Sequence, residues 1–435
     1  MKTSNGVNFL RTHKWEIIVV LLALAVHSIV FLAVLHTNDG GVLDTVRADD
    51  GYFEIATNVL AGNGFSMATT SPYVPNALRT PGYIYFLAGL IGVTGSVAAT
   101  AVMQLLLSCA IPVLGLHIAR RITNSLPIGI AAGIILALDP TLALLSFQFY
   151  TDTLFLILFF AWILLTFRYL ERRDWTLLVA SAVVLGLAIL VRPTAQFIPL
   201  LLVPFILWRF GREDWKHRAA QGIAYLAIIA VILTPWIARN YSEFGAPGLS
   251  SQKAYVLYTN FAPAVLSVAR GSEFALEFTT FSTYAERTSN VITLKNGDEY
   301  IAKALDVIFM YPIATAFVAS KSLFTFFTND GLYTLLVMTG YEPANFLWLL
   351  IPARLVWVAI TIAAFVGAFV YLLTRRSQLE ILIILLVAYF ALTSTIAAFG
   401  TNPRYRLPVD PIILALAAVG GAYLYERMQR LWRAR

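Results

Sequence analysis

Two adjacent carboxylates, Asp49 and Asp50, follow the first long apolar run of the chain. An acidic side chain at the edge of a hydrocarbon layer is costly unless it is solvated or paired, so membrane proteins that keep one there generally use it. A positioned aspartate can take the proton from an attacking hydroxyl group. We therefore interpret Asp49 as a candidate catalytic base, with Asp50 beside it. The alternative is that both acids cap a helix in a solvated loop.

A third acid, Asp152, stands at the start of a later apolar run. The topology derived below puts it on the same side as Asp49 and Asp50, where it could orient the base or the acceptor hydroxyl. A second interpretation is that Asp152 only interacts with the positive end of its own helix dipole. Asp139 precedes a proline and is expected to make a turn.

Arginines close to prolines form a second group of candidates. A guanidinium near the hydrocarbon boundary needs an anion to offset its desolvation, and its fork matches the oxygens of a phosphate. Such residues could hold a lipid-linked phosphate and stabilise the charge that builds as it leaves. The alternative is that they snorkel to lipid headgroups or pair with acids. The candidate donor-phosphate ligands are Arg192, Arg239, Arg404 and Arg406, and the candidate donor or acceptor contacts are Tyr52, Arg79, Tyr83 and Tyr405.

The composition identifies the environment of the chain. Of its 435 residues 59% are hydrophobic and 13% charged, and the mean hydropathy is +0.75. Too few polar residues remain to cover a soluble surface. Continuous apolar runs such as 17–35 and 355–373 favour helical spans over a transmembrane barrel. We therefore predict an all-α polytopic membrane protein, in which the single cysteine, Cys109, excludes an internal disulfide.

Basic residues gather at the ends of the apolar runs, and this pattern predicts the topology. A net charge of +7 could indicate nucleic acid, but the charges lie on no common face, so no nucleic-acid partner is expected. Under the positive-inside rule they mark cytoplasmic ends, and both termini fall inside. The first run is expected to be a retained span. The predicted spans are 15–35, 97–118, 127–142, 149–170, 176–191, 195–208, 222–236, 350–373, 379–399 and 408–425.

Two further apolar stretches, 81–95 and 310–327, do not fit this alternation. We interpret them as interfacial or re-entrant helices on the outer side. For the second stretch a pair of short crossings together with 332–339 is the alternative, so we expect about ten to twelve spans with outer juxtamembrane helices. The chain then divides into three parts: an N-terminal transmembrane module, residues 1–240, with a first outer loop at 36–80; an outer loop or cap, residues 241–308; and a C-terminal transmembrane module, residues 309–435.

An ordered set of short motifs resembles the GT-C glycosyltransferases, closest to the branch of the protein O-mannosyltransferases and the lipid A aminoarabinose transferase. Each motif alone is weak, but their order and spacing cover most of the chain. They are Ala48-Asp49-Asp50-x-Tyr52, Asn63-Gly64-Phe65-Ser66, Arg79-Thr80-Pro81-Gly82-Tyr83, Leu138-Asp139-Pro140, Thr151-Asp152-Thr153-Leu154-Phe155, Arg192-Pro193-Thr194-Ala195, Pro235-Trp236-x-x-Arg239-Asn240-Tyr241 with Phe244-Gly245, and Arg404-Tyr405-Arg406-Leu407-Pro408.

The resemblance implies a function. Family members take a sugar from a polyprenyl-phosphate donor on the extracytoplasmic side and use the acid of the first loop in catalysis. By motif match Asp49 takes that role, Asp152 lies nearby, and Arg239 with Arg404 or Arg406 faces the donor phosphate. The implied enzyme is an inverting glycosyltransferase of the inner membrane that acts on a lipid, glycan or protein acceptor. The chain reads Asp-Asp where the mannosyltransferases have Asp-Glu, so sugar and acceptor stay open.

Two other functions remain in view. A transporter or flippase of lipid-linked sugars should show internal repeats and ionisable groups near the middle of its spans, whereas the acids here cluster at one surface. A glycan polymerase or ligase would use a histidine in a large outer loop, and residues 241–308 contain none. No phosphate-binding glycine loop, dinucleotide fingerprint or zinc spacing is present in the sequence. No metal site is assigned, and a divalent ion is left open.

Overall fold

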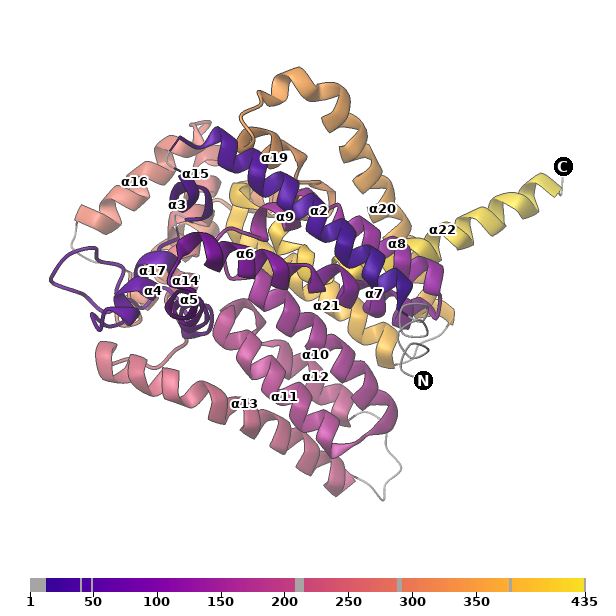
Figure 1. Cartoon of the computed structure of the whole chain (residues 1–435), viewed down its shortest axis with the longest axis horizontal. Coiled ribbons are helices and arrows are strands. Elements are labelled where there is room, and N and C mark those ends of the chain that lie inside the picture. The colour runs from indigo at the N-terminus through magenta and orange to yellow at the C-terminus, as the bar shows by residue number, and fades with distance from the viewer. Residues whose placement is uncertain are drawn as a thin grey trace, which may run out of the picture.

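The computed structural model describes residues 13–39, 41–47, 50–207, 215–287, 292–374 and 378–433. Every regular element in these ranges is helical (Figure 1). This confirms the predicted all-α class.

The N-terminal part comprises α2 (Lys14–Thr37), α3 (Gly41–Val46), α4 (Tyr52–Leu60), α5 (Pro81–Thr94), α6 (Val97–Ser108), α7 (Ala110–Thr123), α8 (Leu126–Ala137), α9 (Pro140–Leu145), α10 (Asp152–Arg172), α11 (Trp175–Val191), η1 (Pro193–Ala195), α12 (Ile198–Leu207) and α13 (Trp215–Phe244). The middle part comprises α14 (Gln252–Val256), the π-helix η2 (Leu257–Phe261), α15 (Ala262–Arg270), α16 (Phe274–Arg287) and α17 (Gly297–Met310). The C-terminal part comprises α18 (Pro312–Thr328), α19 (Leu332–Met338), η3 (Pro343–Phe346), α20 (Leu347–Thr374), α21 (Gln378–Ser394), η4 (Thr395–Gly400), η5 (Pro403–Tyr405), η6 (Leu407–Val409) and α22 (Asp410–Arg433).

Seven helices of the described part are long and apolar enough to cross a membrane. All seven correspond to predicted spans. The remaining three predicted spans, in 127–142, 176–191 and 195–208, coincide with the shorter apolar helices α8, α11 and α12. The protein is therefore a multi-pass membrane protein.

The two stretches that broke the predicted alternation have distinct geometries. Figure 1 shows α5 end-on, whereas α10, α11 and α13 run across the view, so α5 is not parallel to those helices. The second stretch, α18, follows α17 after a bend of 104°. Tyr311 and Pro312 stand at this bend, where a proline can begin a helix but cannot continue one. The bent pair of α17 and α18 is either a broken span or a re-entrant loop, and the interfacial placement of α5 stays a prediction.

The core of the bundle is built around α10. Its aromatic residues recur at helical spacing and stack, with 5.4 Å between the ring centroids of Phe155 and Phe159 and 5.1 Å between those of Phe159 and Trp162. All three are completely buried. Trp162 donates a hydrogen bond to the hydroxyl of Tyr225 on α13 over 3.0 Å. Helix α10 is therefore a fixed element, and Asp152 is its first residue.

Helices α20 and α22 cross at two glycines. A Cβ atom at Gly367 would lie 2.0 Å from the carbonyl oxygen of Leu416, and one at Gly420 would lie 1.9 Å from that of Ala363. Small residues allow this approach of two backbones, as in other membrane helix pairs. The crossing fixes α22 against the bundle, with the 3₁₀ turns η5 and η6 at its start.

Candidate active site

Asp50 is held by Arg79, which lies near the end of the loop segment 36–80. The guanidinium donates through Nε to the backbone carbonyl of Asp50 over 2.9 Å and through Nη2 to its carboxylate over 2.8 Å. Arg79 also lies over the ring of Tyr52, 4.8 Å from its centroid. Gly51 joins Asp50 to α4 with φ +75°, a conformation that glycine adopts without strain. The turn thus directs Asp50 and Tyr52 to the same guanidinium.

The position of Arg79 depends on a close approach of α5 to α11. The hydroxyl of Thr80 donates to the carbonyl of Val191 over 3.1 Å. A Cβ atom at Gly82 would lie 2.8 Å from the backbone of Leu190, so this contact requires a glycine. The end of α11 therefore packs against the start of α5. Arg192 directly follows Val191, and Arg79 directly precedes Thr80, so this contact positions both arginines.

Asp152 is completely buried and pairs with Arg192. The distance between Oδ1 and Nη1 is 2.6 Å, and the arginine side chain is 9% exposed. Arg192 ends α11 in an extended conformation, and Pro193 follows it. Because Pro disfavours a helical conformation in the residue before it, the sequence itself turns Arg192 out of the helix. A buried acid and a buried base are thereby brought into one charge-assisted hydrogen bond.

Arg404 lies between the two acids. Its Nη2 is 4.0 Å from Oδ2 of Asp50, and its Nε is 3.9 Å from Oδ2 of Asp152. The ring of Tyr150 lies 4.7 Å from the guanidinium carbon. Burial alone would lower the pKa of Arg404, but the two acids and Tyr405 together raise it above its ordinary value. The guanidinium therefore stays charged.

Two buried polar atoms of the cluster lack a hydrogen-bond partner among the described residues. Oδ2 of Asp152 and Nε of Arg404 are buried without a hydrogen-bond partner, although they are the two atoms separated by 3.9 Å. An unpaired buried group of this kind is costly, so its persistence points to a ligand or water that completes it. The described cluster also holds three guanidiniums (Arg79, Arg192 and Arg404) but two carboxylates (Asp50 and Asp152). The excess of positive charge suits an anion.

Aromatic rings surround these charges. The ring of Tyr405 lies 5.8 Å from the guanidinium carbon of Arg192 and 5.6 Å from that of Arg404. Tyr52 and Tyr83 meet edge to face, with 5.4 Å between ring centroids. The structure therefore brings Asp50, Tyr52, Arg79, Tyr83, Asp152, Arg192, Arg404 and Tyr405 into one region.

Two residues absent from the sequence-based site contribute to this region. Tyr150 carries the ring below Arg404. Gln104 on α6 accepts a hydrogen bond from the hydroxyl of Tyr83 over 2.7 Å and donates one to the carbonyl of Gln148 over 2.6 Å. It therefore links α5 to the segment that carries Tyr150 and Asp152. Tyr150 directly precedes the motif that begins at Thr151, which was a usable signal, whereas nothing in the sequence singled out Gln104.

The structure does not bring Arg239 into the cluster. Its guanidinium carbon lies 4.9 Å from the ring centroid of Trp236, and it packs against Phe65 and Phe244 as well. It donates to the carbonyl of Asn76 over 3.1 Å. These contacts fix the loop segment 36–80 against the end of α13. The predicted base, Asp49, lies outside the described residues. In the sequence it directly precedes Asp50.

Arg406 also points elsewhere. It is completely buried, pairs with Asp410 over 2.7 Å, and donates to the carbonyls of Phe326 and Asn329 over 3.2 Å and 2.8 Å. Its guanidinium carbon is 3.6 Å from the ring centroid of Trp357. Arg406 thus joins α22 to the end of α18, and no donor-phosphate role follows from this position.

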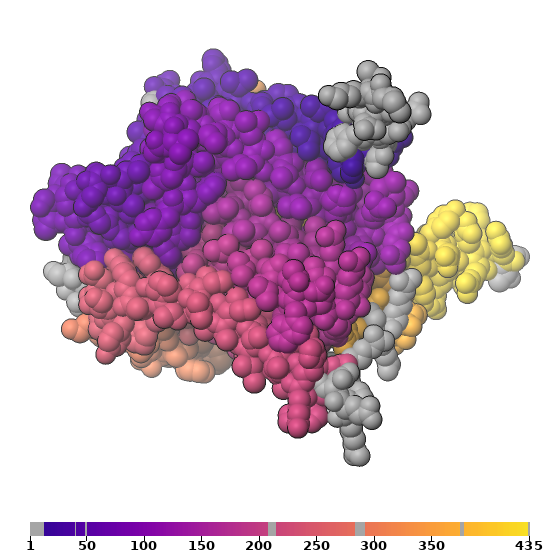
Figure 2. Space-filling model, turned by 60° about the horizontal axis from the view of Figure 1, so that its bottom comes forward, coloured from indigo at the N-terminus to yellow at the C-terminus, as the bar shows by residue number. Residues whose placement is uncertain are grey.

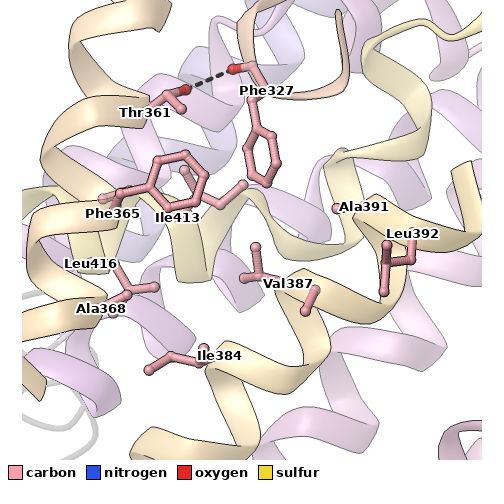
Figure 3. A pocket seen from close by; sticks show the side chains of 12 residues that line it. Phe327, Thr361, Phe365, Ala368, Ile384, Val387, Ala391, Leu392, Ile413 and Leu416 are labelled. Carbon is pink, nitrogen blue, oxygen red and sulfur yellow. Dashed lines mark hydrogen bonds between the residues drawn. The ribbon is translucent and has the colours of Figure 1, made fainter. Parts of the chain in front are cut away.

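An apolar cavity of about 300 Å³ lies between α20, α21 and α22 (Figure 3). Phe327, Phe365 and Val387 are among the side chains that line it. The hydroxyl of Thr361, the polar group in this lining, already donates to the carbonyl of Phe327 over 2.7 Å. The lining suits a hydrocarbon chain but offers no group for chemistry. The charged cluster, and not the cavity, is therefore the candidate active site.

Within the described ranges no group of three or more His, Cys, Asp or Glu side chains is placed to hold a metal ion. The two acids of the cluster each pair with an arginine, Asp50 with Arg79 and Asp152 with Arg192.

Residues 78–238 match a family model described as dolichyl-phosphate-mannose-protein mannosyltransferase. No curated protein matches the chain significantly. The family is of the GT-C type, so the match confirms the resemblance to GT-C glycosyltransferases inferred from the motifs. The matched segment contains Arg79, Tyr83, Asp152 and Arg192, whereas Asp50 and Arg404 lie outside it.

Proposed function

We propose that the protein transfers a sugar from a polyprenyl-phosphate donor to a hydroxyl group of a lipid, glycan or protein acceptor. The observation that carries the proposal is the position of Arg404 between Asp50 and Asp152, next to a second buried pair of Arg192 and Asp152. Guanidiniums supply ligands for a phosphate, and the carboxylates supply proton acceptors. The matching family model, whose description names a dolichyl-phosphate-linked mannose, supports the donor class.

The proposed reaction is a single displacement with inversion. The acceptor oxygen attacks the anomeric carbon as the bond between that carbon and the phosphate oxygen breaks, and the bonding electrons leave with the phosphate. Asp49 takes the proton of the acceptor hydroxyl. Arg192 and Arg404 bind the departing phosphate and stabilise its growing charge, and Arg79 fixes Asp50. Asp152 orients the acceptor or the base through its free Oδ2.

The orientation of the site is part of the proposal. The start of α2 and the end of α22 lie at one end of the bundle, and α3, α4 and the cap helices lie at the other (Figure 1). We assign the end with the cluster to the extracytoplasmic face of the inner membrane, because the basic anchors mark the opposite end. Residues 241–308 then form a cap near the acceptor side: Ser251 donates from its backbone to the carbonyl of Ala77 over 2.9 Å, two residues before Arg79.

The test is donor turnover by purified protein in lipid nanodiscs. A panel of polyprenyl-phosphate sugars is supplied with candidate acceptors, and release of the free polyprenyl phosphate is followed by mass spectrometry. Release that requires an acceptor is expected for the wild type. In Asp49→Asn it should fall by about 10²-fold to 10⁴-fold, the usual contribution of a general base. Asp152→Asn removes the group that orients the acceptor or the base and should lower the release as well. Asp298→Asn, an exposed acid of α17, is the matched control and should keep full activity.

A different result would favour transport. If no donor is turned over, and a fluorescent donor moves between the leaflets equally in the wild type and both site variants, the catalytic assignment of the acids is wrong.

A further inference from the structure

The last part of α22 leaves the bundle as a continuous helix. Every residue from 421 to 433 is exposed. Figures 1 and 2 show this segment standing clear of the remaining helices, at the end of the bundle away from α3 and α4. At about 1.5 Å per residue it is about 20 Å long. No described part of the chain covers it, so its surface is available to another partner.

The exposed segment has two distinct faces. Apolar side chains at helical spacing form one of them, with Met428 57%, Leu431 61% and Trp432 83% exposed. Successive residues turn by about 100° around a helix, which places Leu424 and Tyr425 on this same side. The opposite side carries the polar residues Glu426, Arg427, Gln429, Arg430 and Arg433. Such a pattern, aromatic and aliphatic on one side and basic on the other, is typical of helices that lie in a membrane interface.

The basic face is mostly unneutralised. Glu426 lies 4.0 Å from Arg430, and both side chains are largely exposed. Arg427 donates to the hydroxyl of Tyr423, a neutral partner, over 3.1 Å. Exposed pairs of this geometry contribute little. Three arginines against one glutamate therefore leave a net positive face that can meet anionic groups.

A glycine stands where the segment leaves the bundle. Gly420 is required by the packing of α22 on α20, but a Cβ atom at Gly421 would meet no atom within 4 Å. Packing therefore does not explain Gly421. A glycine inside a helix lowers its stability by about 1 kcal/mol relative to alanine, so this residue weakens the helix at its exit.

We propose that residues 421–433 dock on the membrane surface and bind anionic phospholipid headgroups in the leaflet farthest from the charged cluster. The segment continues a membrane span directly, so headgroups of that leaflet are within its reach. Bending at Gly421 lays the apolar face in the interface and turns the arginines to phosphates. A second copy fits less well, because pairing through the apolar faces would leave the arginines on the outside without anionic partners. The proposal is independent of the glycosyltransferase reaction.

The test uses single-cysteine proteins labelled with an environment-sensitive fluorophore. In a Cys109→Ser background, Met428→Cys samples the apolar face, and Gln429→Cys, its neighbour on the polar face, is the matched control. Each is placed in nanodiscs of phosphatidylcholine with or without phosphatidylglycerol, and nitroxide-labelled lipids serve as quenchers. At position 428 we expect a blue-shifted emission and strong quenching in the anionic nanodiscs. At position 429 we expect neither.

Two further variants separate charge from hydrophobicity. Each arginine beside an anionic leaflet favours docking about five-fold, so Arg427→Gln/Arg430→Gln/Arg433→Gln should weaken it on the order of 100-fold. Gly421→Ala should weaken docking about five-fold by stiffening the exit. The proposal is overturned if position 428 stays in water in anionic nanodiscs or if the triple variant docks like its parent. It is also overturned if the blue shift at position 428 appears only when one nanodisc holds two copies of the protein, because that result would indicate self-association.

Discussion

At the scale of single residues, Arg404 is the group that connects the two acids. Lysine keeps the positive charge but cannot reach Asp50, Asp152 and a phosphate with one planar fork. For Arg404→Lys we expect kcat/KM for the donor to fall by about 10²-fold, the range measured when one preorganised donor to a developing charge is removed. Donor turnover in nanodiscs measures it. Arg270→Lys changes an exposed arginine that pairs with Glu277, far from the cluster in the sequence; it is the control and should be unchanged. Equal activity of both variants would contradict the assignment.

Arg406, two residues later, should behave in the opposite way. Arg406→Met leaves Asp410 buried without its cation, and removal of one partner from a buried pair costs about 3–5 kcal/mol. Thermal unfolding in detergent should show this loss. Arg406→Met/Asp410→Leu, which removes both charges, should recover a large part of it. A stable Arg406→Met protein with impaired donor binding would instead return Arg406 to the active site.

These two arginines show the limit of residue-scale prediction. Their types and their neighbouring prolines were sufficient to single out both. The sequence could not separate them, because the turns η5 and η6 direct Arg404 toward Asp152 and Arg406 toward Phe326, and tertiary contacts determine those directions. The role of Gln104 could not be predicted for the same reason, because its hydrogen bond with Tyr83 exists only once α5 and α6 pack together.

At the scale of elements, the contact between α5 and α11 positions the site. Gly82→Ala places a methyl group 2.8 Å from the backbone of Leu190, so α5 must move and carry Arg79 with it. We expect a lower Tm and a loss of turnover larger than the stability change explains. Gly89→Ala in the same helix meets no atom within 4 Å and is the matched control, with equal or higher stability. Identical behaviour of the two variants would show that the close approach is unimportant.

The sequence predicted the helices better than their orientations. The ten spans predicted from the lengths of the apolar runs and their flanking charges all coincide with helices. The prediction works because a backbone buried in hydrocarbon must satisfy its own hydrogen bonds, which a helix does. The interfacial placement of α5 was inferred from an inconsistency in the charge pattern and not from its own residues, and it stays a prediction. Pro312 marks where α17 ends and α18 begins, but the local sequence does not specify the 104° angle between them.

At the scale of the whole molecule, distant parts of the chain contribute to one charged cluster. Asp50, Asp152 and Arg192 come from its N-terminal half, and Arg404 comes from near its C-terminus. The matching family segment ends at residue 238 and so supplies only part of the cluster. The fold of the whole chain is needed to bring the guanidinium to the acids.

The proposed orientation predicts which end of the molecule a membrane-impermeant maleimide can reach in intact cells. In a Cys109→Ser background, Asp298→Cys lies on the exposed surface of the cap helix α17, and Arg172→Cys lies at the exposed end of α10. The cap cysteine should be labelled in intact cells because the cap belongs to the end that carries the cluster. The cysteine at position 172 should react only after permeabilisation, because it replaces one of the basic anchors that the positive-inside rule assigns to the cytoplasm. The reverse pattern would place the acids and arginines on the cytoplasmic side, where an extracytoplasmic acceptor could not reach them.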